Sequence, residues 1–251
     1  MKTKIIYEDN DLMVIQKPAG LAVQTADVGQ QDVVSELKNY LAAQTPGGRS
    51  QNVRSEGEPY LGIIHRLDQP VEGLLVFAKN RRTAAALTAQ LSGERENGSI
   101  SFNKYYYGVF SGEASDVSGE LIDDMYRDLS GKAVICEPGT KKGDWKIRRA
   151  VLQYRVVQVE KVQNVSLSLA EIHIDTGRYH QIRAQMAHGG MCLLGDAKYG
   201  NAVSRAVSEK LNIRNVALCA FSLEFCHPAT KEKMSFQMKP QGAAFSCFQL
   251  K

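Results

Sequence analysis

Three ionisable side chains crowd a short stretch of the segment 62–80, which reads GIIHRLDQPVEGLLVFAKN. His65, Arg66 and Asp68 precede a strand-like apolar run at Leu74–Ala78. A carboxylate on a loop tip with a strand behind it would be mounted rigidly, as a reacting group must be. The same residue types are also typical of a loop ion pair between Arg66 and Asp68, and the segment alone does not choose between these interpretations.

A second, basic segment covers 172–200 and reads IHIDTGRYHQIRAQMAHGGMCLLGDAKYG. Arg178, His180 and Arg183 lie within six residues of one another, after a strand pattern and at the start of a short helix that ends at Gly189–Gly190. On a helix, His180 and Arg183 would share a face because they are three residues apart. An ordinary exposed basic helix remains the alternative.

The third segment, KYYYGV at 104–109, has the alternation of a strand. It places Tyr105 and Tyr107 on one face and Tyr106 on the other. A tyrosine can stack on a nucleic-acid base and offer its hydroxyl, although tyrosines in strands more often serve packing.

The bulk properties are those of an ordinary globular protein of 251 residues, with a net charge of +4 that permits a polyanionic partner without requiring one. The five cysteines are an odd number without a CxxC pair, so neither a disulfide framework nor a cysteine zinc site is indicated. No signal peptide and no apolar run long enough to cross a bilayer is visible. We expect a soluble cytoplasmic protein.

The periodicity predicts an α+β fold: one domain with a large, mainly antiparallel mixed sheet flanked by helices. Helices are expected from Asp32 onward and over Arg82–Leu91, and polar loops over Ala43–Pro59 and Gly139–Asp144. The expected strands are Ile5–Tyr7, Leu12–Gln16, Lys104–Phe110, Val151–Val159, Val165–Ile174, Ala217–Phe225 and Lys233–Met238.

HRLDQPVEGLLVFAK, KYYYGV and TGRYHQIRAQMAHGGMCLLGDAKYG, in this order, closely resemble the RluA-type pseudouridine synthases. The opening IIYEDNDLMVIQKPAGLAVQ and the closing ALCAFSLEFCHPATKEKMSF resemble the same family. The resemblance implies one catalytic domain over 1–251, without the N-terminal S4-type RNA-binding module of many members. It also implies an isomerase that converts uridines of rRNA or tRNA to pseudouridine without a cofactor or metal, and we expect a monomer.

Carried over residue by residue, the resemblance makes Asp68 the catalytic carboxylate, attacking either the sugar or the uracil ring. Arg183 of the QIR motif would keep that carboxylate ionised. Tyr106 would stack on the target base, and Arg66 would fill the gap left by the flipped nucleotide. Backbone phosphate contacts are expected at Lys79, Lys104, Arg178 and Lys198.

The sequence departs from the family pattern beside these positions. The segment Gln69–Gly73 keeps the family glycine but lacks the usual basic and hydroxyl residues. Tyr179 stands where threonine is usual, and Gly108 where alanine is usual. These changes concern the subtype and the substrate more than the reaction.

Two alternative functions fit the sequence less well. An inactive RNA-binding homologue is disfavoured because Asp68, Tyr106 and Arg183 are all present. A metal-dependent hydrolase would have to use the dispersed set His65, Asp68, His173, His180 and His188, whose spacing matches no zinc motif.

Overall fold

The computed structural model describes residues 1–27, 29–44, 58–93, 102–137, 139–140 and 145–250. The chain divides into two compact units. Unit 1 comprises Met1–Asn103 and Ser222–Met238, and unit 2 comprises Lys104–Phe221 and Lys239–Lys251. Most of the two expected polar loops at 43–59 and 139–144 lies outside the described residues.

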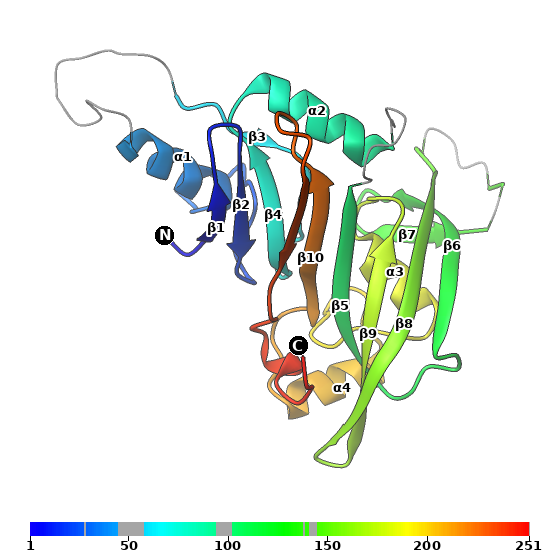
Figure 1. Ribbon diagram of the computed structural model, residues 1–251. Helices are drawn as coiled ribbons and strands as arrows, with labels where there is room; N and C mark the ends of the chain where they lie inside the picture. Colours follow the sequence, from blue (N-terminus) through cyan, green and yellow to red (C-terminus); the bar gives the residue numbers. More distant parts are fainter. Residues whose placement is uncertain (28, 45–57, 94–101, 138, 141–144, 251) are drawn as a thin grey trace. The chain divides into compact units, whose positions relative to one another are not determined.

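Unit 1 is built on a sheet in which β1, β2, β4 and β10 are successive neighbours, with β3 paired to β4 and β11 to β10 (Figure 1). The pairings β1–β2, β2–β4, β3–β4 and β10–β11 are antiparallel. Its elements are β1 (Lys4–Glu8), β2 (Leu12–Lys17), α1 (Val33–Gln44), β3 (Gly62–Ile63), β4 (Glu72–Ala78), α2 (Arg81–Ser92), most of β10 (Leu218–Cys226) and β11 (Lys233–Gln237).

Both helices of unit 1 begin at side chains that satisfy free backbone N–H groups, as helix N-termini require. Asp32 Oδ1 accepts a hydrogen bond from Ser35 N at 2.7 Å, and Asn80 Oδ1 accepts one from Thr83 N at 2.9 Å. Helix α2 ends at Gly93, whose φ of 79° is the left-handed conformation that glycine adopts most easily. The predictions of these two helices are confirmed.

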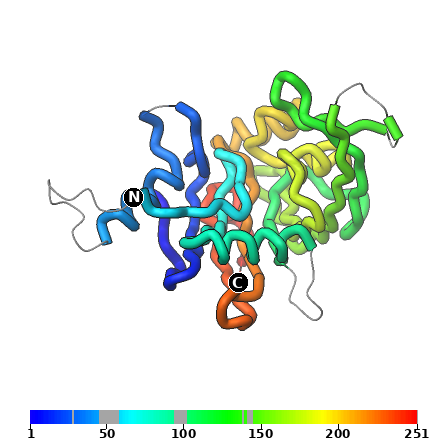
Figure 2. Tube along the Cα trace, turned by 90° about the horizontal axis from the view of Figure 1, so that it is seen from above, coloured from blue at the N-terminus to red at the C-terminus, as the bar shows by residue number. Residues whose placement is uncertain are grey.

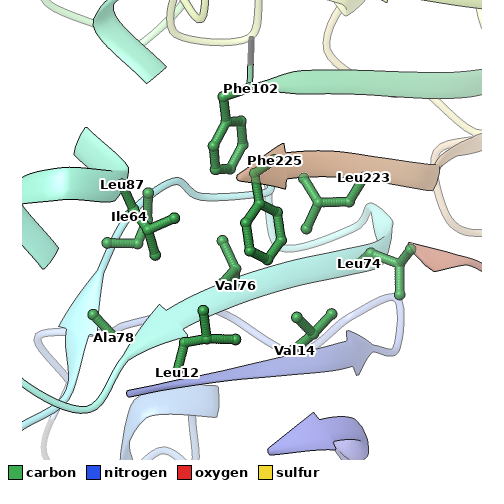
Figure 3. Packing of buried hydrophobic residues seen from close by; sticks show 10 residues of the cluster. All are labelled: Leu12, Val14, Ile64, Leu74, Val76, Ala78, Leu87, Phe102, Leu223 and Phe225. Atoms are coloured by element: carbon green, nitrogen blue, oxygen red, sulfur yellow. The ribbon is translucent and has the colours of Figure 1, made fainter. Parts of the chain in front are cut away.

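The core of unit 1 forms where alternate residues of β2, β4 and β10 point to the same face of the sheet (Figure 3). Helix α2, which passes along β3 and β4, adds Leu87 to this cluster (Figure 2). Phe102 stacks on Phe225 with ring centroids 5.7 Å apart. The cluster consists of Leu12, Val14, Ile64, Leu74, Val76, Ala78, Leu87, Phe102, Leu223 and Phe225.

Unit 2 is a second set of antiparallel strands in the order β5, β9, β8, β6, β7. The long β8–β9 hairpin turns at Gln163 and Asn164, both with positive φ, which is the backbone of a tight hairpin turn. Its elements are β5 (Asn103–Ser111), β6 (Ser118–Arg127), β7 (Ala133–Cys136), β8 (Arg148–Val162), β9 (Val165–Ile174), α3 (Gln181–His188), α4 (Ala202–Lys210), the start of β10 and a short 3-10 helix (Ala243–Phe245).

Helix α3 packs on strands β6, β7 and β8 through a small cluster of Met125, Ala133, Ala150 and Ala184 (Figures 1 and 2). Alanines at this contact let the helix approach the strands closely. The α+β class and the mainly antiparallel sheet flanked by helices are confirmed. The prediction had no strand at β6 or β7 and no helix at α4. None of the helices in the described ranges has both the length and the apolar character needed to cross a membrane.

Candidate active site

Asp68 lies on the loop that connects β3 to β4, as the sequence predicted. The loop closes in a tight turn in which Val71 N donates to Asp68 O at 3.0 Å. Leu67 and Val71 anchor the loop in the interior, with 8% and 2% of their surfaces exposed, while Asp68 is half-buried. The carboxylate therefore stands on a turn whose apolar flanks hold it to the sheet.

Hydrogen bonds from a buried lysine hold this loop in place. Lys17, at the end of β2, is fully buried, and its Nζ donates to three carbonyl oxygens: those of Pro18 at 3.0 Å, Leu21 at 2.7 Å and Gln69 at 3.0 Å. An ammonium group has three donors, so all three are used. The lysine thus joins the turn after β2 to the residue that follows Asp68.

The same two segments are also joined by their backbones. Gly20 N donates to Gln69 O at 2.8 Å, and Gln69 Nε2 donates to Gly20 O at 3.1 Å. Burial lowers the pKa of Lys17 to about 8, although the nearby carboxylates of Asp68 and Glu72 raise it. Sequence reasoning missed Lys17, because no local pattern shows that a lysine is buried.

The other polar residues of the HRLD segment take different roles. Arg66 is exposed, and the described residues contain no Arg66–Asp68 ion pair. His65 Nε2 accepts a hydrogen bond from Val76 N at 3.4 Å, and its ring meets Phe102 edge-on with centroids 5.4 Å apart. The loop ion pair weighed from the sequence is therefore not formed, and His65 contributes to the scaffold.

The three tyrosines of β5 divide between the faces of the sheet as predicted. Tyr106 is buried, with 5% of its surface exposed, opposite Ile172 of β9. Tyr105 contacts the ring of His173 at 4.9 Å, and Tyr107 stacks on Phe221 at 3.7 Å. Tyr105 and Tyr107 thus serve packing.

Gly108 lies two residues after Tyr106, on the same face of β5. The packing around it explains why alanine is absent at this position. A Cβ atom at this position would lie 3.0 Å from Leu193 Cδ2 and 3.1 Å from Ile172 Cδ1. Both distances are shorter than an ordinary carbon–carbon contact. In this chain the larger neighbours fill the space that an alanine methyl would occupy.

Arg183 on helix α3 is oriented by a residue that sequence reasoning missed. Its Nε donates to Asp196 Oδ2 at 2.7 Å and its Nη2 to Asp196 Oδ1 at 2.8 Å, and both side chains are buried. Although burial raises the pKa of Asp196, hydrogen bonds from Arg183 and from the backbone of Lys198 and Tyr199 leave it below its usual value. The pair uses two of the five guanidinium donors, and this bidentate contact fixes the direction of the guanidinium.

The loop before α3, Thr176–His180, is fastened to strand β8 by Gln181. Its Oε1 accepts hydrogen bonds from Thr176 Oγ1 at 2.8 Å and from Arg178 N at 2.9 Å, and its Nε2 donates to Val151 O at 3.0 Å. Thr176 Oγ1 also accepts a hydrogen bond from Val151 N at 3.0 Å. The buried glutamine of the HQIR motif therefore positions the loop that carries Arg178.

Tyr179, where the family usually has threonine, binds the turn between β6 and β7. Its hydroxyl donates to Gly131 O at 3.1 Å, and the Arg127 guanidinium lies 4.4 Å from its ring centroid. Lys198 Nζ donates to the same carbonyl. His180 stacks on Tyr179 at 3.8 Å and shares a hydrogen bond with the hydroxyl of Tyr199 at 2.8 Å, which gives it a scaffold role.

Lys79 has internal partners on the β1–β2 hairpin. Its Nζ donates to Glu8 Oε1 at 2.8 Å and to Asp9 O at 2.6 Å. These contacts tie the end of β4 to the hairpin and leave the expected RNA contact at Lys79 without support from the structure.

The metal-dependent alternative also finds no support. Among the described residues, the group with ligand atoms close enough for an ion is Asp9, Asp11 and His227, and it shares no residue with the set weighed from the sequence. His227 Nδ1 accepts hydrogen bonds from the backbone N of Ala229 and Thr230, while Nε2 bonds to Asp9 Oδ2 at 2.9 Å. Both ring nitrogens are engaged within the protein, so the cluster is a structural junction.

The predicted site residues fall into both units. Asp68, Arg66 and Lys79 belong to unit 1, and Tyr106, Arg183, Lys104, Arg178 and Lys198 belong to unit 2.

Comparison with known proteins gives a consistent result. Residues 11–188 match the RNA pseudouridylate synthase family. The chain is 30% identical over 235 residues to "Ribosomal large subunit pseudouridine synthase D" of Zymomonas mobilis, covering 93% of this chain and 68% of the relative. It is 28% identical to "tRNA pseudouridine synthase C" of Haemophilus ducreyi, covering 94% of this chain and 90% of the relative.

Solved structures share the fold. "Human RNA Pseudouridylate Synthase Domain Containing 4" aligns with a TM-score of 0.66 at 24% identity, covering 95% of this chain and 89% of that chain. "Human RNA Pseudouridylate Synthase Domain Containing 1" aligns with a TM-score of 0.70 at 18% identity, covering 95% and 83%. The chain therefore belongs to the RNA pseudouridylate synthase family, whose members are isomerases that act on RNA.

Proposed function

We propose that this protein isomerises specific uridines of rRNA or tRNA with Asp68 as the catalytic carboxylate. The observation that carries the assignment is the support beneath Asp68: a turn anchored by Leu67 and Val71 and tied through Gln69 to the three-way contact of Lys17. A reacting group needs such a rigid mount, whereas a surface aspartate does not. Relatives named for ribosomal RNA and for tRNA both match, so both RNA classes are proposed substrates.

The reaction breaks the bond between N1 of uracil and C1′ of ribose and forms a bond between C5 and C1′. The proton on C5 leaves and N1 gains one, so no atoms are lost and no oxidant or reductant is consumed. Asp68 would form a transient bond to either the sugar or the ring, and Tyr106 would stack on the base and assist removal of the C5 proton. The atoms and electrons of the isomerisation therefore balance without a cofactor.

Arg183 would supply the positive charge that keeps the catalytic carboxylate ionised when RNA excludes water. Its bidentate contact with Asp196 fixes the direction of the guanidinium. Arg183→Ala should therefore reduce catalysis more than an exposed arginine variant would, and it should also remove the guanidinium partner of the buried Asp196.

Arg66 is exposed on the same loop as Asp68, as expected of a side chain that replaces an extruded uridine. Lys104 and Arg178 are the proposed phosphate contacts in unit 2, whereas Lys198 Nζ already donates to Gly131 O. We further propose that the protein is cytoplasmic and acts as a monomer.

Tritium release from RNA labelled at C5 of uridine tests the proposal. Wild-type protein should release tritium from unmodified ribosomal RNA or tRNA, and Asp68→Asn should not. Asp27→Asn, at an exposed position of the same unit, is the matched control and should retain activity. RNA binding without release by the wild type would instead support the inactive homologue.

A further inference from the structure

Lys104 is a buried lysine whose ammonium group has no counter-charge among the residues that the structure describes. It lies at the start of β5 with 7% of its surface exposed, and it shares a buried face of that strand with Tyr106. Among the described residues, no hydrogen bond or ion pair to its Nζ is present. Burying an ammonium without a partner is costly, so such a group is retained where an external ligand supplies the missing charge.

The ammonium lies beside the loop that precedes α3. A Cβ atom built on Gly177 would lie 3.6 Å from Lys104 Nζ, with no other atom within 4 Å apart from those of the adjacent residues in the chain. The space between the loop backbone and the ammonium is therefore open at the one residue that carries no side chain. Gln181 and Thr176 fix this loop to β8, so the space is preformed.

A second cationic side chain, that of Arg178, lies on the same loop. The guanidinium of Arg178 donates from Nε to Arg149 O at 2.9 Å, and burial together with the nearby charge of Arg148 lowers its pKa. The carboxylate of Asp175 is close in sequence, but it contacts His173 at 3.5 Å and Gln153 at 3.3 Å. Arg148 and Arg178 thus repel each other, and among the described residues no acidic side chain forms an ion pair with Lys104 or Arg178.

We infer that Lys104, the backbone at Gly177 and the guanidinium of Arg178 form a binding site for a phosphate group of the RNA. The inference rests on the proposed function and deepens it, because it selects Lys104 as the central phosphate ligand. Since Lys104 and Tyr106 share a face of β5, the bound phosphate belongs to the target nucleotide or to its neighbour. A phosphate oxygen in this space would give the ammonium its missing partner.

Two variants test the site in different ways. Lys104→Met removes the charge while keeping the length of the side chain. Gly177→Ala keeps every charge and places a methyl group in the open space, at an ordinary contact distance from Nζ. Lys161→Met, an exposed lysine of unit 2 on β8, is the matched control for loss of one positive charge.

The first measurement is the affinity for a uridine-containing RNA hairpin at several salt concentrations. Lys104→Met should weaken binding by about 10- to 100-fold, the range for loss of a charged hydrogen bond. It should also reduce the slope of log affinity against log salt by about 0.7 to 0.9, as for one phosphate contact. Gly177→Ala should weaken binding in the same direction, and Lys161→Met should not.

The second measurement uses inorganic phosphate and does not depend on isomerisation. Phosphate should raise the Tm of the wild type above that in chloride at equal ionic strength, and this effect should be lost in Lys104→Met and in Gly177→Ala. Unchanged RNA affinity and salt slope in Lys104→Met would overturn the inference, whatever the tritium assay shows. A phosphate effect that depends on Lys104, in a protein that releases no tritium, would sustain the phosphate site and refute the proposed function.

Discussion

Replacing Lys104 by methionine should make the free protein more stable. Burial lowers the pKa of Lys104 from 10.5 to about 8, a difference of about 2.5 units. At about 1.36 kcal/mol per unit, the folded state at neutral pH carries a penalty of about 3 kcal/mol for holding this charge. Methionine has a similar length and no charge, so Lys104→Met should gain a stability of this order at pH 7.

The gain should depend on pH in a defined direction. Below pH 8 the lysine is protonated in both the folded and the unfolded states, so the whole penalty is present. Between about pH 8 and 10.5 the folded state releases its proton while the unfolded state still binds one, and the stability of the wild type therefore rises with pH. The advantage of Lys104→Met should shrink over this window and vanish near its upper end.

The assay is urea unfolding at pH 7 and at pH 10, followed by tryptophan fluorescence. The single tryptophan, Trp145, contacts Tyr126 at 4.9 Å between ring centroids and lies in the same unit as Lys104, so its emission reports unfolding of that unit. Lys161→Met should match the wild type at both pH values. A Lys104→Met protein that is less stable than the wild type at pH 7 would refute the reasoning, because it would mean that the ammonium has stabilising partners.

Lys17 provides the contrasting case, because the pKa of its ammonium is also lowered by burial to about 8. Its three donors bind the carbonyl oxygens of Pro18, Leu21 and Gln69. Lys17→Met would leave these acceptors without that donor, at about 1–3 kcal/mol for each one that stays buried. Lys17→Met would also remove the penalty of a buried charge, but the loss of these hydrogen bonds offsets that gain, so it should stabilise the protein less than Lys104→Met does.

Three further outcomes are expected. Asp196→Ala leaves the buried guanidinium of Arg183 without its bidentate partner, so the free energy of unfolding in urea should fall by about 3–5 kcal/mol and tritium release should fall with it. Gly108→Ala should lower stability by about 1 kcal/mol or more, because the methyl group meets side-chain tips at 3.0 Å, and thermal unfolding would detect this. Tyr179→Phe should cost about 1 kcal/mol through loss of the hydrogen bond to Gly131, with its stacking retained, whereas Tyr179→Ala should cost more.

Local sequence signals predicted a large part of the fold. The alternation in β5, β8 and β9 and the acidic N-cap at Asp32 are properties of neighbouring residues, and the structure has strands and a helix there. The position of Asp68 on a loop between strands followed from the same signals. Strand β6 was missed because its apolar residues come in adjacent pairs, Leu121 with Ile122 and Met125 with Tyr126, instead of alternating with polar ones.

The supports of the site could not be predicted, because each depends on a partner that is distant in the sequence or on burial. Lys17 contacts a carbonyl 52 residues away, and Gln181 donates to one 30 residues away. Asp196 stands 13 residues after Arg183, a separation that indicates no contact by itself. A buried lysine and an exposed one look alike in the sequence, since only the fold decides which lysine loses its water.

Hydrogen-bond acceptors within the protein distinguish the lysines that the sequence motifs had assigned to the same role. Lys79 and Lys198 donate to acceptors within the protein, to Glu8 and Asp9 in one case and to Gly131 in the other, so their presence is explained by the fold alone. Lys104 is as buried as a core residue, and within the described part of the chain its Nζ has no such acceptor. A buried charge without a partner in the fold lowers stability. We expect such a residue to be retained where a ligand of opposite charge binds to it. The cost of Lys104 to the free protein is therefore itself an argument that the phosphate belongs beside it.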